Sequence, residues 1–257
     1  MKDNIFSDEQ VAKSGFLDAK EKLKSFAFNS SVASVFDDMI SRSVPGYNSV
    51  QNITSQIALE VIQTDTNVYD IGTSTGTTLI RLISSFQKSG LPPTGKYIGV
   101  DSSEDMLKIC QGKLSALNID SYVSLEISKV EDVLFSNASL IVCHYTLQFL
   151  DPTVRLTVLK NMYDGLNDNG ALIISEKIKY LDPILDTLMT RNYYSFKKEN
   201  GYSEAEISRK REALENVLIP LTLEENIELF KNAGFQIVDV VYSNLLFFTF
   251  VVKKQKI

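Results

Sequence analysis

Residues 68–76 read VYDIGTSTG. The apolar residues at the start of this stretch predict a short buried strand, and Gly72 follows as a turn. The next residues, 77–86, have the pattern of a helix. Glycines at a strand-to-helix turn allow the backbone to adopt positive φ and to approach a ligand closely. We therefore expect a ligand to bind at this turn.

An acidic residue ends the next predicted strand, residues 97–101. Asp101 lies 29 residues after Gly72, where a carboxylate can bind both hydroxyls of a ribose. Asp101 can also serve as an acid that stabilises the start of the following helix. A dinucleotide site would need G-x-G-x-x-G to hold a pyrophosphate, and Ser74 occupies the position of the middle glycine. A nucleoside that carries an amino-acid tail therefore fits this turn better than a dinucleotide.

Short strands and helices alternate through the middle of the chain. Strands are predicted at 122–127, 139–143 and 171–175, and helices at 104–114 and 153–166, which indicates a parallel sheet with both faces covered. A helix at 222–232 ends near Gly234. Two strands then follow, 235–241 and 245–252, and their short connection at Ser243-Asn244 requires antiparallel pairing. This is the layout of the Rossmann-like, seven-stranded class I S-adenosylmethionine-dependent methyltransferase fold.

The whole chain, 1–257, is predicted to form a single domain. Two of its segments are additions to the strand and helix pattern. Residues 1–62 are predicted to form an N-terminal helical lid: 1–30 are polar and expected to be frayed, an apolar stripe at 32–40 predicts a helix that stops near Val44, and a second helix covers 49–62. The insertion 176–220 is predicted to be helical, and Ser203 with Glu206 forms a capping box. At the carboxyl ends of the strands, the insertion would cap the ligand.

Composition restricts the possible functions. The chain has 257 residues with 26 Lys and Arg, 32 Asp and Glu, one His and two Cys, and a net charge of −6. This charge disfavours nonspecific binding to nucleic acid. Cys110 and Cys143 are predicted to be reduced core thiols. With two Cys and a single His, composition excludes a four-thiolate or His-rich metal site and leaves only carboxylates to hold a metal; we expect no metal. The sequence shows no signal peptide or membrane span, which predicts a cytoplasmic protein.

Two positions at predicted strand ends and one aromatic group in the insertion leave alternatives open. His144 ends the fourth strand and either faces a bound ligand or forms internal hydrogen bonds. Lys129 ends the third strand, where it either contacts the ligand or is solvated. The aromatic residues Tyr193, Tyr194 and Phe196 either pack the insertion or provide a surface on which a base stacks.

Five further stretches are distinctive: SVPGY at 43–47, NAS at 137–139, TLQFL at 146–150, SEK at 175–177, and NGYSEAEISRKREALENV at 200–217. They resemble the carboxy-S-adenosyl-L-methionine synthase family from about residue 26 to the C-terminus. The resemblance implies conversion of S-adenosyl-L-methionine and prephenate to carboxy-S-adenosyl-L-methionine and phenylpyruvate. It also implies a homodimer whose product serves a separate tRNA enzyme that makes 5-carboxymethoxyuridine at the wobble position.

Carried over position by position, the resemblance assigns contacts with S-adenosyl-L-methionine or its carboxylated product. Tyr47 would contact it from the lid, Gly72, Thr73 and Ser74 would hold the methionine, and Asp101 and Ser102 would bind the ribose and adenine side. Lys129 and Val130 would bind the adenine, His144 would make a polar contact, and Arg211 would anchor the new carboxylate. Three of these differ from the family pattern, in which we expect Cys, Asn and Asp at 73, 144 and 129. An ammonium cannot accept a hydrogen bond from the adenine amine. Glu131 or Asp132 would have to accept this hydrogen bond in place of the expected Asp at position 129, or the backbone of Val130 would make the adenine contact.

In the implied reaction, prephenate loses carbon dioxide and hydroxide. The hydroxide removes a proton from the methyl group on the sulfonium, and the carbon dioxide is then captured. A base derived from the substrate explains why the sequence needs no His/Asp dyad. Arg211 suits bidentate binding of a carboxylate, although an ion pair with Glu215 is an alternative. The competing functions are a conventional S-adenosylmethionine-dependent methyltransferase, on a small molecule or a tRNA, and a non-catalytic binding protein.

Overall fold

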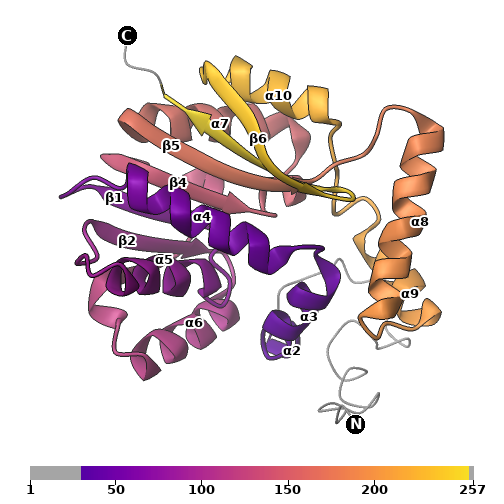
Figure 1. Ribbon diagram of the computed structural model, residues 1–257, viewed down its shortest axis with the longest axis horizontal. Coiled ribbons are helices and arrows are strands. Elements are labelled where there is room, and N and C mark those ends of the chain that lie inside the picture. The colour runs from indigo at the N-terminus through magenta and orange to yellow at the C-terminus, as the bar shows by residue number, and fades with distance from the viewer. Residues whose placement is uncertain (1–29, 255–257) are drawn as a thin grey trace.

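A seven-stranded sheet forms the centre of the molecule (Figure 1). The computed structural model describes residues 30–254, so the prediction of a frayed N-terminus falls almost wholly outside the described residues. The strands are β1 (Asn67–Ile71), β2 (Lys96–Asp101), β3 (Val123–Ile127), β4 (Ala138–His144), β5 (Leu166–Lys177), β6 (Ile237–Asn244) and β7 (Phe247–Lys253). Their spatial order is β3-β2-β1-β4-β5-β7-β6. β1 to β5 pair in parallel, whereas β7 is antiparallel to both β5 and β6. The predicted fold is confirmed.

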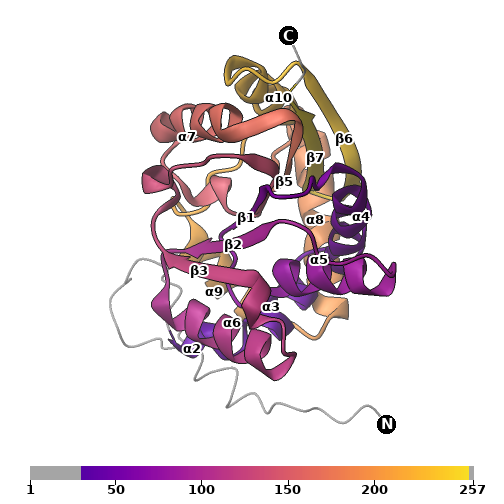
Figure 2. The same ribbon diagram turned by 90° about the vertical axis from the view of Figure 1, so that its left-hand side faces the viewer.

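Helices cover both faces of the sheet (Figure 2). The helices are α2 (Ser30–Ala33), α3 (Phe36–Ser43), α4 (Tyr47–Val61), α5 (Thr77–Lys88), α6 (Glu104–Ala116), α7 (Pro152–Gly165), α8 (Pro183–Glu199), α9 (Glu204–Leu214) and α10 (Leu223–Asn232). Alternate strand residues such as Val68 and Leu140 pack against α4, α5 and α6. Their neighbours, such as Tyr69 and Ile141, pack against α7 and α10. This two-sided burial follows from the period of two in a strand.

The C-terminal hairpin turns later than the sequence predicts. β6 runs through Ser243 and Asn244, and the turn is made by Leu245 and Leu246. Leu246 is only 2% exposed because it packs with Tyr145 and Tyr193. The predicted turn was therefore wrong: burial of an apolar turn against the insertion outweighed the local preference of Ser and Asn for turns.

The N-terminal lid and the insertion lie against each other. α3 ends at Ser43, close to the predicted stop. The Oγ atom of Ser43 lies 3.0 Å from the hydroxyl of Tyr202, and the Tyr193 hydroxyl donates to the Ser43 carbonyl at 3.0 Å. The predicted capping box of Ser203 and Glu206 is present at the start of α9. Two segments that the sequence places at opposite ends of the domain thus form one continuous cap.

Candidate active site

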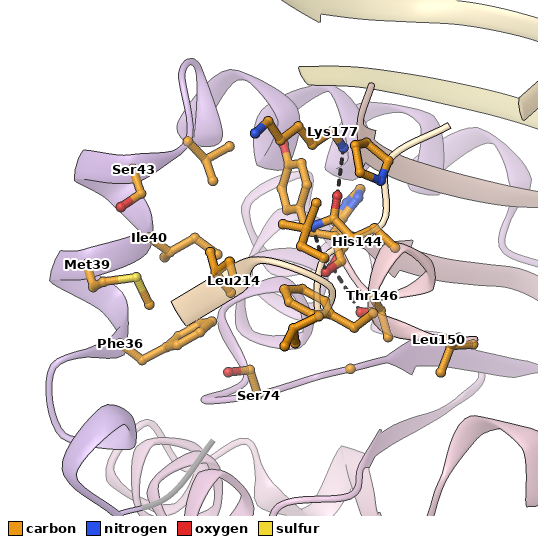
Figure 3. Close-up of a pocket in the computed structure, with 18 of the residues that line it drawn as sticks. Phe36, Met39, Ile40, Ser43, Ser74, His144, Thr146, Leu150, Lys177 and Leu214 are labelled. Carbon is orange, nitrogen blue, oxygen red and sulfur yellow. Dashed lines mark hydrogen bonds between the residues drawn. The ribbon is translucent and has the colours of Figure 1, made fainter. Parts of the chain in front are cut away.

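A cavity of about 900 Å³ lies at the carboxyl ends of the parallel strands. One wall is formed by the sheet and its loops, and the opposite wall by α3 and α9. Figure 3 shows Phe36, Met39 and Ile40 of α3 facing Ser74, His144 and Thr146 of the sheet side across this space. The volume is at the upper end of the roughly 300–1,000 Å³ that small-molecule sites occupy. The cavity is therefore large enough for a ligand of the size of a nucleoside that carries an amino-acid tail.

The glycine turn forms the floor of the cavity. Gly72 has φ +69°, and a Cβ atom there would lie 2.1 Å from the Thr146 Oγ1 atom. That hydroxyl donates to the Ile71 carbonyl at 3.1 Å and so holds the loop after β4 against the turn. Ser74 also has positive φ, 53°. The turn is therefore shaped by a close approach of two loops, which only glycine at position 72 allows.

Asp101 links the turn to the next helix. Its Oδ2 atom accepts a hydrogen bond from the Ser74 N–H at 2.9 Å, and its Oδ1 atom accepts one from the Ser103 N–H at 2.8 Å. Burial raises the pKa of this carboxyl group. The Ser102 backbone also hydrogen-bonds to this carboxyl group. A carboxylate has about four lone-pair positions, so one remains for a ribose hydroxyl. Ser102 lies beside it at the exposed rim of the cavity.

Two predicted contact residues support the turn from behind the cavity wall. Neither Thr73 nor Tyr47 is among the described residues that line the cavity. The Thr73 hydroxyl donates to the Asp70 Oδ2 atom at 2.7 Å, and burial raises the pKa of Asp70 to about 7. The hydroxyl of Tyr47 bonds with the side chain of Thr77, and burial raises its pKa. In this structure both residues position the start of α5 and the turn.

The loop after β3 lines the end of the cavity nearest Asp101. Lys129, Val130 and Glu131 all face this space, whereas Asp132 is not among its described lining residues. Lys129 is exposed and Val130 is buried, with 8% of its surface accessible. Of the two acids that could replace the family's Asp, Glu131 is the one placed at the cavity.

His144 lies at the cavity wall with both ring nitrogens engaged. The Nδ1 atom lies 2.8 Å from the Ser175 Oγ atom, and Nε2 lies 3.0 Å from the Thr54 Oγ1 atom. Burial lowers the pKa of His144 to about 3, so the ring is neutral at physiological pH. Of the two alternatives for His144, the structure shows internal hydrogen bonds. The residue contacts the cavity through its ring and has no free nitrogen.

Arg211 reaches the cavity from α9. It forms no ion pair with Glu215 or with any other residue of the described part of the chain. The alternative in which Arg211 pairs with a helix glutamate is therefore not observed. An exposed, unpaired guanidinium at the mouth of a cavity is available to bind an incoming carboxylate.

Three lysines at the cavity were missed from the sequence. Lys177 ends β5, Lys197 lies on α8 and Lys210 precedes Arg211 on α9. Burial lowers the pKa of Lys197 to about 8 and that of Lys210 to about 7. Lysine runs are usually solvated, so composition gave no indication of them. The distinctive stretches at 175–177 and 200–217 contain Lys177 and Lys210. The helical spacing of four from Tyr193, which packs against Phe247, to Lys197 was a further signal.

Glu176 is a further buried acid at the strand ends, and its Oε1 atom has no hydrogen-bond partner among the described residues. Glu176 is 3% exposed and accepts hydrogen bonds from the backbone N–H groups of Leu147 and Gln148, and burial raises its pKa to about 8. Residues 30–254 contain no group of three or more His, Cys, Asp or Glu side chains that could hold a metal ion. Cys110 and Cys143 are buried free thiols, as predicted.

Comparison with known proteins identifies the family. The chain is 42% identical over 221 residues to carboxy-S-adenosyl-L-methionine synthase of Methylococcus capsulatus, which covers 86% of this chain and 90% of that protein. It is 40% identical over 255 residues to the protein of the same name from Wolinella succinogenes, covering 99% of both. The chain belongs to the carboxy-S-adenosyl-L-methionine synthase family. Like its family, it is an S-adenosylmethionine-dependent transferase.

Broader comparisons agree on the fold. Residues 69–172 match the family described as a methyltransferase domain. An O-methyltransferase family protein from Burkholderia thailandensis superposes with a TM-score of 0.63 at 14% identity, over 96% of this chain and 68% of that chain. A putative S-adenosyl-L-methionine-dependent methyltransferase from Methanococcus maripaludis gives 0.58 at 18% identity, over 92% and 98%. Among residues 30–254 of this synthase, no helix is long and apolar enough to span a membrane.

Proposed function

We propose that this enzyme converts S-adenosyl-L-methionine and prephenate to carboxy-S-adenosyl-L-methionine and phenylpyruvate. The product would serve a separate tRNA enzyme that builds 5-carboxymethoxyuridine, so the chain itself need not contact nucleic acid, and it would act in the cytoplasm. The observation that carries this proposal is that Arg211 lines the same cavity as the turn residues Gly72 and Ser74. A site for a nucleoside with an amino-acid tail thus has a free guanidinium facing it.

The proposed reaction balances without an external base. Prephenate, a dianion, breaks its bond to the ring carboxylate and its bond to the ring hydroxyl, which gives phenylpyruvate, carbon dioxide and hydroxide. The sulfonium makes the C–H bonds of its methyl group acidic. The hydroxide removes one of these protons and becomes water, and the methyl carbon then forms a new bond to carbon dioxide. Neutral His144, whose two nitrogens already have partners, is not needed as a base.

The protein contributes binding, orientation and exclusion of water. The turn at Gly72 and the carboxylate of Asp101 would hold the substrate's methionine and ribose, and Arg211 would hold the new carboxylate. Apolar side chains of the cap, among them Phe36 and Leu214, line the cavity. Such a lining keeps water from carbon dioxide and strengthens electrostatic interactions within the cavity.

Mass spectrometry tests the proposal. Purified protein is incubated with S-adenosyl-L-methionine, with and without prephenate, and the ligand is analysed after denaturation. We expect a species heavier than S-adenosyl-L-methionine by one carbon dioxide, only when prephenate is present. Accumulation of S-adenosylhomocysteine without this species would instead indicate a conventional methyltransferase. Unchanged S-adenosyl-L-methionine in both samples would indicate a binding protein.

We also propose that the enzyme is a homodimer. Leu181, just before α8, and Ile184 and Leu188, four residues apart within it, are 79%, 81% and 46% exposed. Exposed apolar stripes of this kind often mark protein interfaces. Light scattering should give the mass of a dimer for the wild-type protein and of a monomer for Ile184→Asp. A monomeric wild-type protein would contradict this proposal.

A further inference from the structure

One buried lysine, Lys197, and one half-buried lysine, Lys177, lie next to the same aromatic ring. The ammonium group of Lys197 lies 4.6 Å from the centre of the Tyr193 ring, and that of Lys177 lies 5.3 Å from the same point. Both residues line the cavity. Tyr193 is only 7% exposed and is fixed by its hydrogen bond to the Ser43 carbonyl. The ring therefore holds two positive charges at one place on the cavity wall.

These charges are poorly compensated by the protein. Neither Lys177 nor Lys197 forms an ion pair within residues 30–254. Lys197 is 6% exposed, and its pKa is lowered by burial and by the charge of Lys177. The pKa of Lys177 is lowered by burial, against which Asp186 acts weakly. Buried charges without a partner are unfavourable unless a ligand neutralises them.

The position of the lysines separates them from the nucleoside end of the cavity. Strand order places β5, which ends at Lys177, three strands from β2, which ends at Asp101, with the glycine turn of β1 between them. Neighbouring strands lie about 4.8 Å apart, so this separation is roughly 14 Å. A ligand held at Asp101 and the turn would extend toward the lysines without covering the whole cavity.

We propose that Lys177 and Lys197 form the binding site for the carboxylates of the second substrate, a dianionic organic acid. This inference rests on the proposed function, in which that acid is the carboxyl donor, and it assigns the donor to a subsite distinct from Arg211. Two cations around a fixed ring match two carboxylates on a small rigid anion. Lys210, whose ammonium group donates to the Ser43 Oγ atom at 2.9 Å, adds positive charge to the same wall.

Matched substitutions test this site. Lys177→Met and Lys197→Met remove one charge each and keep most of the side-chain length. Their controls are Lys179→Met and Lys198→Met, neighbours on the same segments whose ammonium groups lie 3.5 Å from Glu225 and 2.5 Å from Glu204 at the surface. Prephenate binding is measured by titration calorimetry on protein saturated with S-adenosylhomocysteine. S-adenosylhomocysteine binding is measured in parallel.

We expect each cavity variant to weaken prephenate binding by roughly 10- to 100-fold, the effect of losing one charge-assisted hydrogen bond. Binding of S-adenosylhomocysteine should stay within about twofold of wild type, and both controls should leave both affinities unchanged. Lys177→Arg and Lys197→Arg should recover most of the loss. If Lys197→Met fails to fold, Lys177→Met at the half-buried position carries the test.

Prephenate affinity within about twofold of wild type in both Met variants would overturn the assignment, as would an equal loss of prephenate and S-adenosylhomocysteine. The proposed function is judged separately by product formation in the wild-type protein. Lysine-dependent prephenate binding without carboxylated product would support the anion site and contradict the proposed reaction. Carboxylated product together with prephenate binding that does not depend on Lys177 or Lys197 would support the proposed reaction and contradict the anion site.

Discussion

The two walls of the cavity are built on different physical principles. The sheet wall consists of backbone groups and short polar side chains whose hydrogen bonds are already made, such as Asp101 with the Ser74 and Ser103 N–H groups. The cap wall carries the cations Lys197 and Arg211, and Lys177 lies close to Lys197 at the end of β5. None of the three forms an ion pair within residues 30–254. The sheet wall suits a neutral nucleoside and its amino-acid tail. We expect the cap wall to bind anions, which a carboxylating enzyme needs and a conventional methyltransferase does not.

The largest effect should come from the sheet wall, through Gly72→Ala. A Cβ atom there would lie 2.1 Å from the Thr146 Oγ1 atom, at φ +69°, so the loop after β4 must move. We expect binding of S-adenosyl-L-methionine to fall by at least roughly 100-fold and the protein to unfold at a lower temperature. Gly90→Ala is the control, because Gly90 also has positive φ, +71°, but no heavy atom within 4 Å of the added carbon. Equal effects of the two variants would show that backbone strain, and not the close approach, matters.

The second largest effect should come from the cap wall, through Arg211→Ala, and should change product formation with little change in cofactor binding at the sheet wall. Arg211→Ala should lose most of the carboxylated product, by roughly 100-fold, since a bidentate charge-assisted contact is removed. Binding of S-adenosyl-L-methionine should stay within several-fold, because the sheet wall is intact. Arg209→Ala, on the same helix but bonded to the Ala205 carbonyl, should change neither quantity. A parallel loss of product and of binding in Arg211→Ala would contradict its role as a carboxylate anchor.

A third test uses the buried acid at the end of β5. The pKa of Glu176 is raised from 4.5 to about 8 in the folded protein, so the folded state keeps a proton that the unfolded state releases near pH 4.5. The contribution of Glu176 to the free energy of unfolding should therefore fall as pH rises from about 4.5 to about 8, whereas His144, with its lowered pKa, contributes in the opposite direction up to about pH 6.5 in both proteins. For one proton the slope is about 1.4 kcal/mol per pH unit. Urea unfolding at pH 5, 6, 7 and 8 should show a shallower slope by about this amount in Glu176→Gln. Asp70, also raised, contributes in the same direction in both proteins, and identical slopes would exclude the assignment to Glu176.

The smallest effect concerns the adenine end. Glu131 lines the cavity beside Lys129, whereas its neighbour Asp132 is not among the described lining residues. If Glu131 accepts the adenine amine, Glu131→Gln should weaken binding of S-adenosyl-L-methionine by about two- to fivefold, as expected for one exposed hydrogen bond. Asp132→Asn provides the comparison at an adjacent exposed acid and should have no effect. Calorimetry that finds both variants equal to wild type would leave the Val130 backbone as the adenine contact.

The sheet wall could largely be predicted from the sequence because its determinants are local. The period of two in the strands, the glycines of 72–76 and the acid at the end of β2 all lie within a short stretch, and the structure places Gly72, Ser74 and Asp101 together at the cavity. The capping box of Ser203 and Glu206 is equally local and is present.

The cap wall depends on contacts between distant parts of the chain, which composition and periodicity do not reveal. Ser43 and Tyr202, whose side chains join the lid to the insertion, are 159 residues apart. Lys197 and Lys198 are chemically identical in the sequence, yet one is buried at the cavity and the other is an exposed partner of Glu204. The apolar turn at Leu245-Leu246 was missed for the same reason, since its cause is packing against Tyr145 and Tyr193.

Isotope tracing tests the central claim most directly. Wild-type protein is incubated with S-adenosyl-L-methionine and prephenate that carries ¹³C in the carboxylate attached to its ring. If the cap wall directs carboxylation, the label will appear in a sulfonium product heavier than S-adenosyl-L-methionine by one labelled carbon dioxide, and phenylpyruvate will be unlabelled. Release of the label as free bicarbonate, with S-adenosylhomocysteine as the spent substrate, would contradict the account.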